Sequence, residues 1–171
     1  MRALKTPCLM RVGVASGGLM PNDDAVLRVG DGVARYADWG RPPQELSLKF
    51  VLGQPGWYRF TLKFANANGP INTGITAAVK AVTVRCGGAA EQSGSVTMPH
   101  LAEGMAWGFS TGFFFQAGSG DACELRVADG FNMSYLAHFA HYTGGRGGAS
   151  GALNRADIAA ARIDLIRSAL P

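Results

Sequence analysis

A strict alternation of apolar and polar side chains in one segment most constrains the fold of this chain. In residues 57–64, with the sequence WYRFTLKF, every second residue from Tyr58 to Phe64 is large and apolar, and the residues between them are polar. Successive side chains of a β-strand point to opposite faces of its sheet, so this period of two places the apolar residues on one face. The segment is therefore predicted to be an antiparallel strand with one face buried.

Further segments have the same period and are separated by glycine-rich turns. Residues 46–52 alternate in the same way, and the sequence GQPG at 53–56 is typical of a turn, so we expect residues 46–52 and 57–64 to form a hairpin. In residues 78–84 the alternation is imperfect, because Lys80 falls on the same side as Val82 and Val84. Short strands are predicted at these ranges: 78–84, 95–98, 113–116 and 124–127.

The last segment fits two kinds of structure. Asn154 followed by Asp157 resembles a helix N-cap, and the alanines within residues 156–161 favour a helix. Residues 161–166, however, alternate as a closing strand would. We favour the strand.

Glycine content supports a fold made of short strands. Glycine accounts for 24 of the 171 residues, about twice its usual share, which implies many tight turns and few long helices. The predicted fold class is all-β: a two-sheet antiparallel β-sandwich, or jelly roll, with a long loop insert before the last strand. We expect residues 25–171 to form this one domain and residues 1–24 to be an N-terminal leader or linker.

Charge and hydropathy bear on the partners. The net charge is +4, and the 16 basic residues are scattered singly rather than clustered, so we expect no nucleic-acid partner. No apolar stretch reaches the roughly 18 residues that a transmembrane helix needs, so we expect no membrane span. The first twenty residues begin like a secretory signal, but Arg11 interrupts the apolar stretch, so there is no clear signal peptide.

The cysteines leave two interpretations open. Cys8, Cys86 and Cys123 form no CxxC pair, which gives no support to a zinc site or a thioredoxin motif. Cys86 ends one predicted strand and Cys123 begins another. If those strands are antiparallel neighbours, the two thiols face each other and form a disulfide, as in an exported protein. The other interpretation is two buried free thiols.

The sequence carries no recognised enzymatic motif. There is no GxSxG elbow, no GxxxxGK[ST] loop and no GxGxxG element after a strand. The acidic residues are evenly spread, so none is marked as a catalytic pair. His138 and His141 lie three residues apart but lack the HExxH pattern, and a small hydrolase or lyase built on them is a minor alternative. We expect the protein not to be an enzyme.

The loops contain amides and aromatic rings. Asn66 and Asn72 lie in FANANGPINTG, Trp107 in MAWGFST and Tyr142 in HYTGG, and Asn154 precedes the last segment. Aromatic rings stack on the apolar faces of sugar rings, and amides offer a donor and an acceptor to neighbouring hydroxyls. The set predicts a carbohydrate-binding surface. For any single residue, the alternative is that asparagines serve turns and aromatic rings fill the core.

A family resemblance appears at the segment PGWYRFTLKFANANGP, residues 55–70. This segment resembles the central strand of the jelly-roll carbohydrate-binding modules of families 6 and 35. VKAVTVRCGG, SVTMP, MAWGFST, FFFQAG and ELRV follow in the order of that pattern, which covers residues 26–170. The resemblance implies a ligand site in the loops at one edge of the sandwich, where Trp107, Tyr142 and Asn154 match by position.

The resemblance also implies a cofactor and a biological setting. The family commonly binds a structural calcium ion, and Asp164 or Asp157 would be the aspartate ligand in the last strand, although residues 26–29 contain no glutamate for the first strand. The implied protein is a non-catalytic module that holds a polysaccharide or oligosaccharide near a neighbouring catalytic domain of a glycan-active enzyme. Such a protein is secreted, and the implied localisation is extracellular or periplasmic.

The sequence departs from the family pattern by an insert at residues 132–151. The part NMSYLAHFAHYTGG is more apolar than an ordinary loop, and the following GGRGGASG is rich in glycine. Exposed apolar surface of this kind suits docking onto another protein surface. The alternative function is therefore a structural or interaction β-sandwich domain that docks onto a neighbouring domain or subunit of a glycan-active enzyme.

Overall fold

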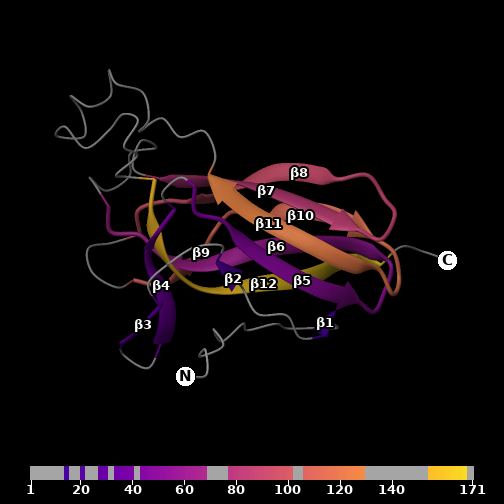
Figure 1. The fold of residues 1–171 in the computed structure, drawn as a ribbon, viewed down its shortest axis with the longest axis horizontal. Coiled ribbons are helices and arrows are strands. Elements are labelled where there is room, and N and C mark those ends of the chain that lie inside the picture. The colour runs from indigo at the N-terminus through magenta and orange to yellow at the C-terminus, as the bar shows by residue number, and fades with distance from the viewer. Residues whose placement is uncertain are drawn as a thin grey trace, which may run out of the picture.

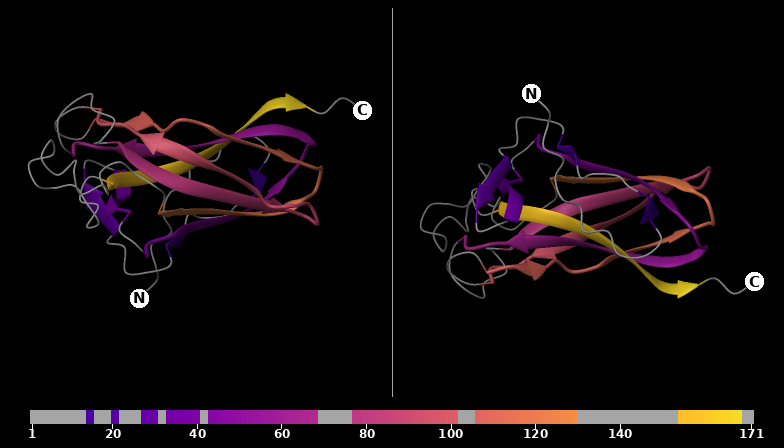
Figure 2. Two further views of the ribbon diagram at one scale, coloured as in Figure 1. Left: turned by 90° about the horizontal axis from the view of Figure 1, so that it is seen from above. Right: turned by 90° about the horizontal axis from the view of Figure 1, so that it is seen from below.

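Two antiparallel sheets packed face to face make up the described part of the chain (Figures 1 and 2). The computed structural model describes residues 14–15, 20–21, 27–30, 33–40, 43–68, 77–101, 106–129 and 154–168. Within these residues every regular element is a strand. The predicted two-sheet antiparallel β-sandwich of the jelly-roll class is confirmed.

The first sheet has the strand order β1-β5-β11-β7-β8, and β2 also pairs with β5. Its strands are β1 (Val14–Ala15), β2 (Met20–Pro21), β5 (Leu46–Leu52), β7 (Ala78–Cys86), β8 (Gln92–Met98) and β11 (Ala122–Asp129). Short segments of the predicted leader thus pair with the edge of this sheet. The domain boundary at residue 25 stays a prediction.

The second sheet has the order β10-β6-β12-β4-β3, and β9 also pairs with β6. Its strands are β3 (Leu27–Gly30), β4 (Val33–Trp39), β6 (Gly56–Ala65), β9 (Gly108–Phe109), β10 (Phe113–Ala117) and β12 (Ala156–Ser168). The favoured strand at the end of the chain is confirmed: β12 has 13 residues and lies between β6 and β4. β3 and β4 lie at the end of the sandwich where β12 begins (Figure 1).

The core lies between the sheets and is centred on aromatic rings. Phe115 of β10 is fully buried, and its ring centroid lies 5.7 Å from that of Tyr58 and 6.0 Å from that of Phe113. Phe50 of the first sheet meets the same ring edge-on at 6.2 Å. Offset and edge-to-face arrangements at these distances are favourable beyond the burial of area alone. The alternation in the sequence is thus the alternation of core and solvent faces.

The predicted hairpin of β5 and β6 is wrong, because the two strands lie in different sheets. The turn between them is exposed at residues 53–55 and connects one sheet to the other, so β5 pairs with β11 while β6 pairs with β12 and β10. The end of β5 is held by the β10–β11 turn, since Leu52 N donates to Asp121 O at 3.2 Å and Gly120 N donates to Leu52 O at 2.7 Å. Both strands have one apolar face, and the crossing lets those faces pack on each other.

The two predicted disulfide partners lie on neighbouring strands. β7 and β11 are antiparallel, and Cys86 is directly opposite Cys123. The Cα atoms are 4.1 Å apart, and the side chains are joined in a disulfide. The disulfide joins the end of β7 to the beginning of β11 in the first sheet. Cys8 lies outside the described residues.

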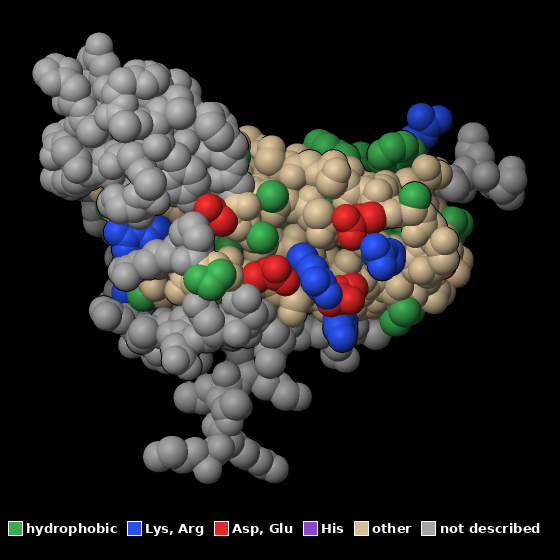
Figure 3. Space-filling model, turned by 45° about the horizontal axis from the view of Figure 1, so that its top comes forward, with side chains coloured by type: hydrophobic (Ala, Val, Ile, Leu, Met, Phe, Trp, Pro, Cys, Tyr) green, Lys and Arg blue, Asp and Glu red, His purple; other side chains and the backbone are tan. Residues whose placement is uncertain are grey.

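Ion pairs cover the outer face of the first sheet. Arg85 pairs with Glu91 at 3.4 Å, and Arg126 pairs with Glu124 at 3.1 Å and with Glu45 at 3.9 Å. Figure 3 shows basic and acidic side chains next to one another on one face of the molecule. Because opposite charges are interleaved, this surface has no single-sign field. Among the described residues, no helix is long and apolar enough to cross a membrane.

Candidate functional site

The structure describes three of the five residues predicted to bind a ligand. Asn66, Trp107 and Asn154 are described, and the three do not form one surface: both asparagines are buried, whereas the Trp107 ring is half-exposed. Asn72 and Tyr142 lie outside the described residues, as do His138, His141 and the insert at residues 132–151.

Asn66 shapes the turn that follows β6. Its Nδ2 donates to Met98 O at 2.9 Å, and its Oδ1 accepts from Asn68 N at 2.9 Å. The latter bond is the Asx-turn geometry in which an asparagine side chain holds the backbone two residues on. Asn68 in turn donates from Nδ2 to Arg155 O at 2.7 Å, which ties the turn to the start of β12. The buried side chain of Asn66 therefore serves the scaffold of the loop.

His100 lies beneath the same turn. Its Nδ1 is 3.0 Å from Asn68 O, and a carbonyl oxygen only accepts, so Nδ1 carries the proton. The ring is buried, and its Nε2 has no hydrogen-bond partner among the described residues.

Trp107 and Phe109 lie at the short strand β9 of the second sheet. Phe109 belongs to β9 and lies opposite Lys63 of β6, and Trp107 directly precedes β9. Lys63 Nζ lies 5.8 Å from the centroid of the Trp107 ring, and the Arg162 guanidinium lies 5.6 Å from that of Phe109. Phe109 is 52% exposed. We call these four residues, Trp107, Phe109, Lys63 and Arg162, the aromatic strip.

Sequence reasoning named Trp107 but missed its three companions. A signal was present in the sequence WGF, because a second aromatic residue, Phe109, follows Trp107 after a single glycine. Lys63 of β6 and Arg162 of β12 had no such signal in the sequence. Their place beside the rings depends on which strands are neighbours in the sheet, and a short sequence segment does not specify strand neighbours.

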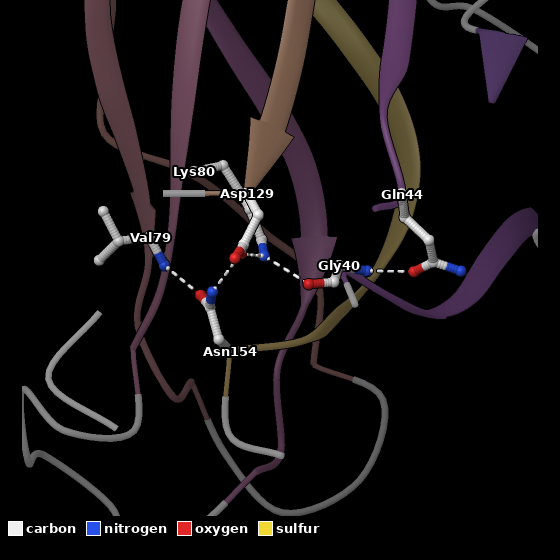
Figure 4. Close-up of polar contacts among 6 residues, drawn as sticks. All are labelled: Gly40, Gln44, Val79, Lys80, Asp129 and Asn154. Carbon is white, nitrogen blue, oxygen red and sulfur yellow. Dashed lines mark hydrogen bonds and ion pairs between the residues drawn. The ribbon is translucent and has the colours of Figure 1, made fainter. Parts of the chain in front are cut away.

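Asn154 lies in a polar network inside the sandwich (Figure 4). Its Oδ1 accepts from Val79 N at 2.9 Å, and its Nδ2 donates to Asp129 Oδ1 at 2.6 Å. The same Asp129 oxygen accepts from Lys80 Nζ at 2.9 Å. Lys80 Nζ also donates to Gly40 O at 2.7 Å. The network joins the ends of β7 and β11 of the first sheet to β4 and β12 of the second.

Lys80 is the most unusual member of this network, because it is 0% exposed. Burial lowers the pKa of Lys80, and the hydrogen bond and charge of Asp129 oppose that shift. The Trp39 ring, with its centroid 5.4 Å from Nζ, faces the same nitrogen. The break in the alternation at residue 80 thus marks a polar group placed in the core, which sequence reasoning did not recognise as part of a site.

The two aspartates predicted to bind calcium are held by arginines. Asp157 Oδ2 accepts from Arg35 Nε at 2.8 Å, and its Oδ1 accepts from Asp38 N at 2.8 Å. Asp164 accepts from Arg59 Nη2 at 3.1 Å and from Arg162 Nε at 2.7 Å.

Calcium takes six to eight oxygen ligands, and here guanidinium groups occupy the carboxylates, so these residues fit the ion poorly. Among the described residues, no group of three or more His, Cys, Asp or Glu side chains is placed to hold a metal. Structural calcium stays an implication of the family resemblance alone.

Comparisons with known proteins give similarity only at the level of solved structures. No protein-family model matches the sequence, and no curated protein matches it. An exo-β-1,3-galactanase from Phanerochaete chrysosporium, solved with galactose, matches at a TM-score of 0.47 and 18% identity over 85% of this chain and 26% of its own. A cycloisomaltooligosaccharide glucanotransferase from Paenibacillus sp. matches at 0.44 and 11% identity over 86% of this chain and 16% of its own.

A family 35 carbohydrate-binding module, solved with a disaccharide that contains glucuronic acid, also matches. Its TM-score is 0.45 at 12% identity, and the match covers 93% of this chain and 90% of the module. The chain thus spans about a quarter or less of the galactanase and the glucanotransferase, but nearly the whole of this module. The fold defines a jelly-roll β-sandwich protein, and family 35 modules are among the solved structures that it resembles.

Proposed function

We propose that the protein is a non-catalytic carbohydrate-binding module and that the aromatic strip binds a polysaccharide or oligosaccharide. The observation that carries this proposal is that two aromatic rings close together in the chain, the half-exposed Trp107 and the exposed Phe109, each lie beside a basic side chain of the second sheet. An exposed ring stacks on the apolar face of a sugar. Lys63 and Arg162 beside the rings supply donors to hydroxyl oxygens.

The setting of this function is part of the same proposal. A disulfide persists in oxidising compartments, so the Cys86–Cys123 link supports a secreted protein that acts outside the cytosol. The module would hold its glycan near a neighbouring catalytic domain. Linking the module to a second glycan-binding unit raises the effective concentration of glycan at the module. Weak contacts at the aromatic strip would then be enough to retain the glycan.

Affinity gel electrophoresis tests the proposal directly. The purified chain is run in gels that contain plant, bacterial or algal polysaccharides, in parallel with Trp107→Ala and Phe109→Ala. We expect one glycan to retard the wild type and each variant to lose most of the retardation. Phe114→Ala is the matched control, because Phe114 is equally exposed at 53% but belongs to β10. Equal retardation of wild type and both strip variants would contradict the proposal.

A second function is favoured by one further observation. Trp57, Phe114 and Ile166 expose 46%, 53% and 50% of their surface on the second sheet. Exposed apolar groups suit contact with another protein. In this alternative, the chain is a structural or interaction domain that docks onto a neighbouring domain or subunit of a glycan-active enzyme. Migration that is unchanged across the whole glycan panel would favour it.

A further inference from the structure

The buried network contains a nucleophile without access to water. Lys80 Nζ is enclosed in the core and touches Gly40 O at 2.7 Å, Asp129 Oδ1 at 2.9 Å and the face of Trp39. Burial disfavours the charged form of an amine, and only the neutral amine has a lone pair for attack. Desolvated lysines are activated as nucleophiles in this way.

The side chain of Asn154 supplies an electrophile in the same place. It is 0% exposed, and Val79 N donates to its Oδ1 at 2.9 Å. A backbone N–H on a carbonyl oxygen polarises the carbonyl and stabilises the negative charge that develops there when a nucleophile adds to the carbon. Val79 directly precedes Lys80, so one stretch of β7 supplies both the N–H that donates to the Asn154 oxygen and the attacking nitrogen.

Asp129 connects the two reacting groups through a single atom. Its Oδ1 accepts from Lys80 Nζ at 2.9 Å and from Asn154 Nδ2 at 2.6 Å, so the two nitrogens are no more than about 5.5 Å apart. Figure 4 shows the three side chains pointing toward one another, Lys80 from β7, Asp129 from the end of β11 and Asn154 from the segment just before β12. The carboxylate therefore touches both the nitrogen that would lose a proton and the nitrogen that would gain one.

We propose that Lys80 and Asn154 form an intramolecular isopeptide bond, with Asp129 as the proton carrier. Lys80 Nζ attacks Asn154 Cγ, and the new Nζ–Cγ bond replaces the Cγ–Nδ2 bond. Asp129 takes a proton from Nζ and delivers it to Nδ2, which leaves as ammonia. The reaction needs no oxidant, reductant or cofactor, and holding the groups in a fixed arrangement supplies much of the rate.

The position of the bond gives it a structural role that the disulfide lacks. The Cys86–Cys123 disulfide joins two strands of the first sheet. A Lys80–Asn154 bond would join β7 of the first sheet to Asn154, two residues before the start of β12 in the second sheet. Covalent closure between the sheets restricts the unfolded chain and keeps the sandwich from separating.

The intact mass of the folded, fully reduced protein tests the proposal. We expect the wild-type chain to be about 17 Da lighter than its sequence requires, because ammonia is lost. Asp129→Asn keeps the size of the side chain but removes the carboxylate, and Lys80→Met removes the nucleophile. Both variants should have the mass of their sequences. Circular dichroism shows whether each variant has kept its strands.

Tandem mass spectrometry of a tryptic digest identifies the bond itself. Loss of ammonia by asparagine alone, as a cyclic imide at Asn154, gives the same mass change but no cross-linked peptide. We expect one branched peptide that contains both Lys80 and Asn154 and resists cleavage after Lys80. A wild-type chain at the mass of its sequence, or a lighter chain without the branched peptide, overturns the proposal even if both variants fail to fold.

Discussion

The carbonyl oxygen of Gly40 accepts a hydrogen bond of 2.7 Å from Nζ of Lys80, so the residue after β4 in the second sheet holds a side chain from the first. Gly40 has a φ of +124°, which residues with a side chain rarely adopt. A Cβ on Gly40 would also lie 2.7 Å from Lys80 Nζ and 2.8 Å from Asn154 O. Glycine is thus required here both by backbone conformation and by the close approach of the network.

Gly40→Ala is expected to destabilise the protein strongly. The strained backbone alone costs about 1 to 3 kcal/mol, and the added methyl group displaces Lys80. Gly88→Ala is the matched control, because a Cβ there meets nothing within 4 Å and should change the free energy of unfolding by less than about 0.5 kcal/mol. Urea denaturation of both variants measures the difference. Equal stability of the two variants would show that Gly40 is not constrained.

Reduction of the disulfide is expected to lower the free energy of unfolding by about 2 to 4 kcal/mol. Cys86 and Cys123 are 37 residues apart, so the link closes a substantial loop of the unfolded chain. Urea denaturation with and without dithiothreitol measures the loss, and the Cys86→Ala/Cys123→Ala double variant should show no effect of the reductant. Under denaturing conditions without reductant, a thiol titration should find one free thiol per chain. Three would indicate that the bond is absent.

The strands could be predicted from the sequence because their signal is local. Each strand has one core face, so the period of two in 46–52 and 57–64 marks the strand directly. The pairing of those two strands could not be predicted. A turn such as GQPG suits either a hairpin or a crossing between sheets, and both leave the same alternation in the sequence. The difference lies in the hydrogen bonds to β11 and β12, which are distant in the chain.

The candidate site could be predicted only in part, because residue type does not specify burial. Asn66 and Asn154 have the amides that a sugar site uses, but the structure places both inside, where their hydrogen bonds hold backbone groups. Trp107 was found because an aromatic residue in a glycine-flanked segment stands out. Lys80 was seen as an irregularity. The burial of Lys80 is explained only by the structure, in which Gly40 and Asp129 accept hydrogen bonds from its amine.

Removal of calcium is expected to leave the thermal unfolding temperature unchanged. Arginines already pair with both aspartates. A calcium ion at Asp157 would have to displace Arg35, and a calcium ion at Asp164 would have to displace Arg59 and Arg162. Thermal melts in EDTA and in millimolar calcium test this expectation, with magnesium as the control for ionic strength. A rise in melting temperature with calcium that is lost in Asp164→Asn would instead establish the implied metal site.

Replacement of neighbouring phenylalanines in β10 is expected to have very different effects on the free energy of unfolding. Phe115 is 0% exposed and contacts Tyr58, Phe113 and Phe50 in the centre of the core, whereas Phe114 is 53% exposed. Phe115→Ala should lower the free energy of unfolding by about 3 to 5 kcal/mol through lost burial and a cavity. Phe114→Ala should change it by less than about 0.5 kcal/mol, because its ring lies on the solvent face. Urea denaturation of both variants provides the test.

A shift of one residue in the pairing of β10 with β6 would exchange the core and solvent faces of β10. A larger loss of unfolding free energy for Phe114→Ala than for Phe115→Ala would therefore contradict the register in which Phe115 lies opposite Tyr58.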